Sequence, residues 1–141
     1  MTELAKQRPE FRNINAFRDL PTYRLPAPGW VSILHRVSGV LMFVLLPLII
    51  WIFDTSVSSE ISSARLRTAF STGATGVILK LVALALIWAY LHHFIAGVRH
   101  VWMDTSHKAV SKAWGGTSAK VTLVASLLLT VVLGAKLFGL Y

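Results

Sequence analysis

The chain has 141 residues, of which 55% are hydrophobic and only 14% are charged, and its mean hydropathy is +0.62. Soluble domains usually carry about 25% charged residues, so this composition excludes a soluble enzyme and a nucleic-acid-binding protein. The net charge of +8 does not change that conclusion, because the basic residues cluster beside long uncharged runs and form no continuous stripe. The absence of cysteine from the sequence excludes disulfide scaffolds, iron–sulfur ligation and thiol catalysis.

Three runs with few charges predict transmembrane helices. They cover residues 37–53, with an extension back to Trp30, residues 81–98 and residues 121–135. At a rise of about 1.5 Å per residue, each run with its flanks crosses a hydrocarbon core about 30 Å thick. We therefore predict an all-α integral membrane protein with three transmembrane helices, the first of them bent by Pro47. The predicted segments are 1–29 (cytoplasmic N-terminal segment), 30–53 (helix one), 54–76 (outer connection), 77–103 (helix two), 104–119 (cytoplasmic connection) and 120–141 (helix three).

The charges beside these runs predict the orientation in the membrane. Five basic residues precede helix one, and the second connection carries Lys108, Lys112 and Lys120 against the single acid Asp104. The positive-inside rule then places the N-terminus in the cytoplasm and the C-terminus outside. Acidic residues within the first 25 positions are untypical of an organelle presequence. We therefore expect a bacterial inner membrane with a periplasmic C-terminus.

Polar residues inside the predicted spans gather at the cytoplasmic ends of helices one and two. Ionisable groups at such depth are costly, and they usually face a partner, a cofactor or a water-filled cavity. The two segments are about sixty residues apart in the sequence but lie in the same half of the membrane. Polar residues with purely structural roles would not be expected to gather in this way. The residues concerned are Ser32, His35 and Arg36 on helix one, and His92, His93, Arg99, His100 and Asp104 on helix two.

The spacing around His93 suits a planar macrocycle. Ala89 and Gly97 lie one helical turn before and after His93, so they leave a flat slot beside it. Two axial imidazoles on one iron must lie at the same depth in the membrane. His35 lies only about 7 Å from Trp30, which marks the cytoplasmic side, whereas His93 lies near mid-membrane. The second axial ligand is therefore expected from another chain. Cations and donors at a lower depth, namely His35, Arg36 and His100, would suit haem propionates.

Structural roles stay open beside this interpretation. A histidine in a membrane helix can equally be a hydrogen-bonded packing residue, and we expect His92 to be one or to face a partner. We expect Arg99 to extend to the lipid headgroups and Asp104 to neutralise His100. The alternative function is a haem-free membrane scaffold or assembly subunit, which a b-type haem spectrum would distinguish.

Two strings resemble signatures of the cytochrome b subunit of succinate dehydrogenase. Residues 32–39 (SILHRVSG) are similar to the signature that opens its first membrane helix. Residues 93–100 (HFIAGVRH), followed by Asp104, are similar to its second signature. The order of the motifs, the three helices and the chain length all agree, so the resemblance covers nearly the whole chain.

The resemblance implies a subunit of the succinate:ubiquinone oxidoreductase complex that is not catalytic alone. It implies that His93 is an axial ligand of haem b, within a helical bundle of which a second membrane anchor subunit forms the other half. It places Ser32 and Arg36 at the ubiquinone pocket, and His35, Arg36 and His100 near the haem propionates. The other implied partners are a flavoprotein and an iron–sulfur subunit. The basic N-terminal segment and second connection would dock these subunits and anionic headgroups.

Overall fold

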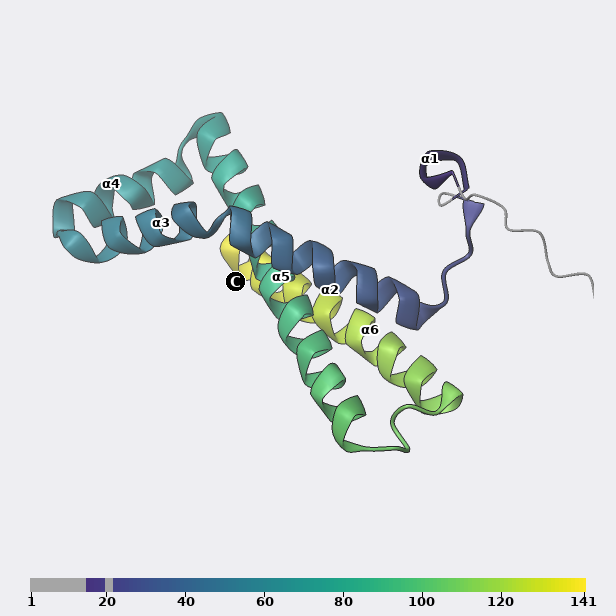
Figure 1. The fold of residues 1–141 in the computed structure, drawn as a ribbon. Coiled ribbons are helices and arrows are strands. Elements are labelled where there is room, and N and C mark those ends of the chain that lie inside the picture. Colours follow the sequence, from purple (N-terminus) through teal and green to yellow (C-terminus); the bar gives the residue numbers. More distant parts are fainter. Residues whose placement is uncertain (1–14, 20–21) are drawn as a thin grey trace, which may run out of the picture.

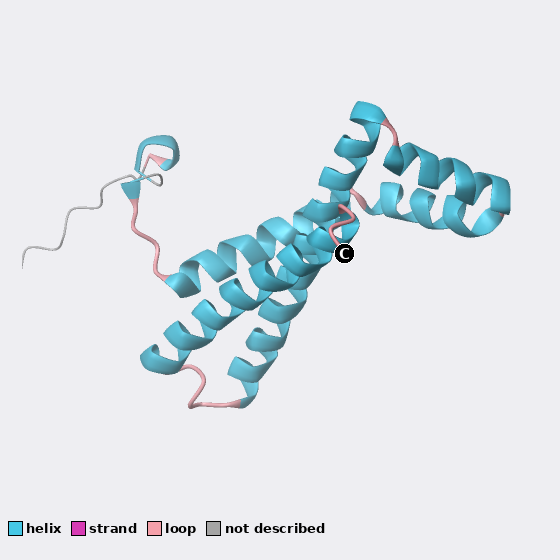
Figure 2. Cartoon of the chain, turned by 180° about the vertical axis from the view of Figure 1, so that it is seen from behind, coloured by secondary structure: helices cyan, strands magenta, loops and turns pink. Residues whose placement is uncertain are grey.

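The structure, a computed structural model, describes residues 15–19 and 22–141 (Figure 1). Within these ranges every regular element is helical, which confirms the predicted all-α fold (Figure 2). Most of the predicted N-terminal segment lies outside the described residues. In chain order the elements are α1 (Ala16–Asp19), α2 (Ala27–Val44), α3 (Leu46–Ser58), α4 (Glu60–Ser71), α5 (Gly73–Thr105) and α6 (Lys112–Leu137).

Helices α2, α5 and α6 pack together as a bundle (Figures 1 and 2). Each is long and apolar enough to cross a membrane, which confirms the three membrane helices expected from the sequence. Large apolar side chains such as Val40, Phe43 and Leu128 are more than half exposed on the outside of the bundle. A bilayer provides the apolar solvent that such a surface needs.

The predicted first helix is divided in two at Leu45. Leu45 has φ −88° and ψ 2°, and α3 starts at the next residue with Pro47 in its first turn. Proline has no N–H for the carbonyl four residues earlier, and its ring clashes with that carbonyl, here that of Phe43. Backbone N–H groups at the cap of α2 donate to the carbonyls of Leu41 and Phe43 instead. The chain therefore changes direction here, and helix one as predicted over 30–53 corresponds to α2 and the first half of α3.

Helices α3 and α4 form a hairpin that projects from one end of the bundle, opposite the connection between α5 and α6 (Figure 1). The N-terminus of α4 has a capping box, in which Ser59 and Ser62 each bind the backbone N–H of the other. Gly73, with φ +56°, starts α5 in the left-handed region that glycine tolerates. A Cβ on Gly76 would lie 2.8 Å from the Phe70 carbonyl oxygen, so glycine permits α5 to return against α4.

Small residues on α6 form the seam along which it packs in the bundle. They recur every three or four positions, which keeps them on one helical face. Their small size lets the helix backbones approach closely, as is common in membrane bundles. At Gly134 a Cβ would lie 2.8 Å from Leu84 Cδ1 of α5. The buried seam residues are Gly115, Ala119, Thr122, Ser126, Thr130 and Gly134.

Candidate functional site

His93 of α5 is fixed against α2 by a hydrogen bond to the main chain. Its Nδ1 lies 3.0 Å from the carbonyl oxygen of His35. A carbonyl only accepts hydrogen bonds, so Nδ1 must carry a proton. In the neutral ring, Nε2 then presents a lone pair. This is the arrangement of most metal-binding histidines, in which a backbone carbonyl fixes the tautomer and the orientation of the ring.

Ser38 of α2 adds a second contact to the same nitrogen. Its hydroxyl donates to the His35 carbonyl at 2.9 Å, and its Oγ lies 3.3 Å from His93 Nδ1. Because the Ser38 proton is directed to the carbonyl, the Oγ lone pairs can accept from His93. Ser38 is fully buried, so water does not compete for these bonds. The contact with His93 depends on the packing of α2 on α5, which the sequence alone does not show.

Three histidines come together at this point. The rings of His35 and His93 stack with their centroids 4.0 Å apart and an interplanar angle of 13°. The ring of His100 lies 5.3 Å from that of His35. The sequence placed these three histidines in one region, but the expectation that His35 lies at a lower depth than His93 is wrong. Helix α2 starts at Ala27, before the predicted start at Trp30, and packs on α5 so that His35 lies level with His93. Asp104 is exposed, one turn beyond His100.

Two glycines shape the space around these rings. A Cβ on Gly39 of α2 would lie 3.0 Å from His93 Cε1, so the His93 ring packs directly against the α2 backbone. A Cβ on Gly97 of α5 would meet only His35 Nε2, at 3.8 Å. Gly97 therefore leaves room on the His93 face of α5, and the His35 ring extends into that room. The role of Gly39 was missed from the sequence, although its position four residues after His35 is a signal.

His92 faces away from this cluster. It is fully buried, its Nδ1 lies 3.1 Å from Ser126 Oγ of α6, and its ring stacks on Trp88 with the centroids 5.6 Å apart. His92 is thus a packing residue inside the bundle, one of the two roles expected for it. Its partner Ser126 was not recognised from the sequence.

Arg99 folds onto α6 and does not extend outwards from the bundle to the lipid headgroups, so the expected outward extension is wrong. Its side chain is 7% exposed. Its Nε donates to Ser118 Oγ at 2.9 Å, and its Nη2 donates to the Gly115 carbonyl at 3.1 Å. The guanidinium binds the early turns of α6 because these groups offer acceptors that hydrocarbon lacks.

Ser32 and Arg36 lie one turn apart on α2, so they share a helical face. Ser32 is half-buried and Arg36 is exposed. Ser32 lies in the first half of α2 and Arg36 just past its middle, next in sequence to His35. An exposed arginine on a membrane helix requires a counter-charge or a polar partner from outside the chain.

Residues 5–133 match the model of the family described as Succinate dehydrogenase/Fumarate reductase transmembrane subunit. The chain belongs to this family. The succinate dehydrogenase cytochrome b556 subunit of Rickettsia felis is 30% identical to it over 81% of this chain and 85% of the relative. The subunit of the same name from Coxiella burnetii is 29% identical over 82% of this chain and 90% of the relative. The family and the three apolar helices make this chain a membrane protein.

The packing of His93 on Gly39 predicts different responses to alanine at two helical glycines. Alanine normally stabilises a helix by about 0.5–1 kcal/mol relative to glycine. At Gly116, where a Cβ would meet nothing within 4 Å, we expect Gly116→Ala to show this gain. At Gly39 the contact at 3.0 Å forces the His93 ring to move, so Gly39→Ala should lose the gain or destabilise the protein. The free energy of unfolding in detergent micelles measures both, and equal stabilisation by the two would contradict the contact.

Proposed function

We propose that the chain is the membrane-anchoring cytochrome b subunit of succinate dehydrogenase, as the names of its relatives indicate. In this role it binds haem b together with a second membrane anchor subunit, which supplies the other axial histidine. It also helps to form the site where ubiquinone receives electrons from the iron–sulfur subunit, and it is not catalytic alone. The observation that carries the proposal is the hydrogen bond from His93 Nδ1 to the His35 carbonyl.

His93 is the residue of this chain that fits an axial haem ligand. Its Nδ1 is held by α2, which orients the ring and leaves Nε2 as the coordinating atom. His92 is less suitable, because it is fully buried inside the bundle and its Nδ1 is engaged with Ser126. A haem with two imidazole ligands has no open position and supplies electron transfer instead of oxygen chemistry.

Binding at this site requires a rearrangement of His35. Its ring stacks on His93 and fills the room beside Gly97 that a macrocycle would need. Rotation about its side-chain bonds would release this room and direct the imidazole towards His100, whose ring is already 5.3 Å away. His35, His100 and the exposed Arg36 would then supply donors and positive charge for two propionates.

Ser32 and Arg36 would bind the quinone. The Ser32 hydroxyl can donate a hydrogen bond to a quinone carbonyl, and Arg36 remains charged at any physiological pH. A fixed positive charge beside the ring stabilises the negative charge that develops there during reduction. Their common face on α2 supports a shared role, since one bound quinone could contact both side chains.

A haem-free membrane scaffold or assembly subunit is the second candidate. The observation in its favour is the close stack of His35 on His93, which fills the slot with this chain's own side chain. A b-type band in the reduced-minus-oxidised spectrum of the purified complex separates the two candidates, since only the cytochrome subunit produces it.

We predict that His93→Gln abolishes the b-type band whereas His92→Gln retains it. Glutamine keeps hydrogen-bonding capacity at both positions but does not ligate haem iron as imidazole does. The spectrum is recorded on complex whose assembly has been verified by the recovery of all subunits. Retention of the band in His93→Gln and its loss in His92→Gln would reverse the assignment.

We predict that Arg36→Leu lowers quinone-linked succinate oxidation by about 30- to 1000-fold, as expected for the loss of about 2–4 kcal/mol of charge stabilisation. Ser32→Ala should lower it less. Oxidation linked to an artificial dye, which takes electrons directly from the soluble subunits, should persist in both variants. The control Lys112→Leu removes an exposed charge from α6 and should keep the ratio of the two activities. An unchanged ratio in Arg36→Leu would exclude a role at the quinone.

We predict a cytoplasmic N-terminus and a periplasmic C-terminus from the basic residues beside helices one and two. A reporter that is active only in the cytoplasm should therefore be silent when it is fused after Tyr141. The same reporter inserted into the connection between α5 and α6 should be active. A bright C-terminal fusion in assembled complex would invert the topology.

A further inference from the structure

Arg99 is a buried cation whose partners within the chain are neutral. Its side chain is 7% exposed, and it donates to Ser118 Oγ and to the Gly115 carbonyl oxygen. Neither acceptor carries a negative charge. The hydrogen bonds position the guanidinium, but in the described part of the chain they leave its charge without a carboxylate.

One nitrogen of the guanidinium stays available. Within residues 15–19 and 22–141, the single buried side-chain nitrogen or oxygen without a hydrogen-bond partner is His92 Nε2. The two hydrogen bonds of Arg99 use Nε and Nη2. Its Nη1 is therefore not enclosed, and it can donate to an acceptor that enters from outside.

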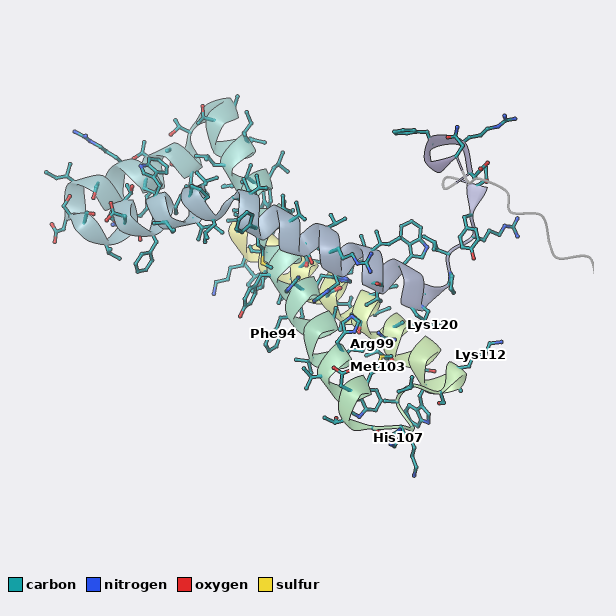
Figure 3. The ribbon with its side chains drawn as sticks, viewed as in Figure 1. Phe94, Arg99, Met103, His107, Lys112 and Lys120 are labelled. Atoms are coloured by element: carbon teal, nitrogen blue, oxygen red, sulfur yellow. The ribbon has the colours of Figure 1, made fainter. Side chains whose placement is uncertain are left out.

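Arg99 lines a groove of about 360 Å³ between α5 and α6. Ile95, Val98 and Val121 make its walls largely apolar. Trp102 and Trp114 line the part nearest the connection between the two helices, and their rings meet edge to face at 6.4 Å. Figure 3 shows Arg99 between α5 and α6, whereas Phe94 projects away from the bundle.

The surroundings of the groove are positively charged. Lys108, Lys112 and Lys120 lie on the connection and on α6, with Asp104 as the one acidic residue between positions 99 and 120. The N-terminus of α6, which begins at Lys112, adds the positive end of a helix dipole. Tryptophan rings favour the depth of the headgroups, so this end of the groove suits an anion at the membrane surface.

We propose that this groove binds an anionic phospholipid. Its phosphate accepts a hydrogen bond from Arg99 Nη1, and an acyl chain lies along Ile95, Val98 and Val121. Basic pockets between transmembrane helices recognise anionic headgroups in this way. A phospholipid supplies both the anion that Arg99 lacks and an apolar chain for the groove. The site is independent of the proposed haem and quinone sites.

The test compares phosphatidylglycerol with phosphatidylcholine of identical acyl chains, each titrated into the full-length chain in a neutral detergent. Native mass spectrometry counts the bound lipid. We expect a preference for phosphatidylglycerol, which Arg99→Gln lowers about fivefold. Phosphatidylcholine should lose less affinity, because it has the same phosphate but no net negative charge. The control Lys136→Gln removes the same charge from an exposed residue at the other end of α6 and should keep the wild-type preference.

A second variant is useful because Arg99 also binds α6. Val121 is 60% exposed on the groove wall, so Val121→Trp fills the groove while the hydrogen bonds of Arg99 remain. It should lower the amount of bound phosphatidylglycerol. An unchanged amount in Val121→Trp, or an equal loss of preference in Arg99→Gln and Lys136→Gln, would overturn the proposal. The proposal would also be overturned if Arg99→Gln bound phosphatidylglycerol normally but no longer assembled with the partner subunits. The anion that pairs with Arg99 would then be a carboxylate of a partner subunit.

Discussion

A polar side chain inside the hydrocarbon core must find its hydrogen-bond partner on a neighbouring helix, because no water is available there. Helix α5 meets this constraint with two adjacent histidines that face different neighbours. His92 binds Ser126 of α6, and His93 binds the main chain of α2 at His35. Successive side chains differ by about 100° around a helix, so the two bonds fix the rotation of α5. A rotation of α5 that shortened one of these two hydrogen bonds would break the other.

The same division repeats one heptad later. Arg99 follows His92 by seven residues and binds α6, whereas His100 follows His93 by seven residues and lies beside His35 of α2. Residues seven apart are separated by only about 20° on a straight helix, so each pair forms one stripe. The close approach to α6 depends on its small residues, since Gly115 exposes the carbonyl that Arg99 binds. Close packing also has a cost, because His92 Nε2 is buried without a partner, which typically costs about 1–3 kcal/mol.

The three membrane helices were predictable because long apolar runs are local features of the sequence. The gathering of His35, His93 and His100 in one region was predictable from the two polar segments, but the direct contact of His35 with His93 was not, because counting helical rises from Trp30 placed His35 at a lower depth. The break at Leu45 was expected only as a bend at Pro47, because periodicity does not show how a freed carbonyl is satisfied. The partners of Arg99 and His92 were not predictable, as they depend on which face of α6 packs against α5. A small-residue pattern at 115, 119, 122 and 126 was the available signal.

The two stripes give the faces of α5 different tasks. The stripe of His92 and Arg99 holds α6, so its side chains are engaged within the chain and their removal acts first on the stability of the bundle. The stripe of His93 and His100 contacts α2 and includes Gly97, beside which the nearest side-chain atom is His35 Nε2. An imidazole can coordinate a metal only through a nitrogen that the metal can reach. His92 Nε2 is enclosed in the bundle, whereas His93 is only half-buried, so the stripe facing α2 is the one that would suit the proposed haem, and two adjacent histidines can have unrelated roles.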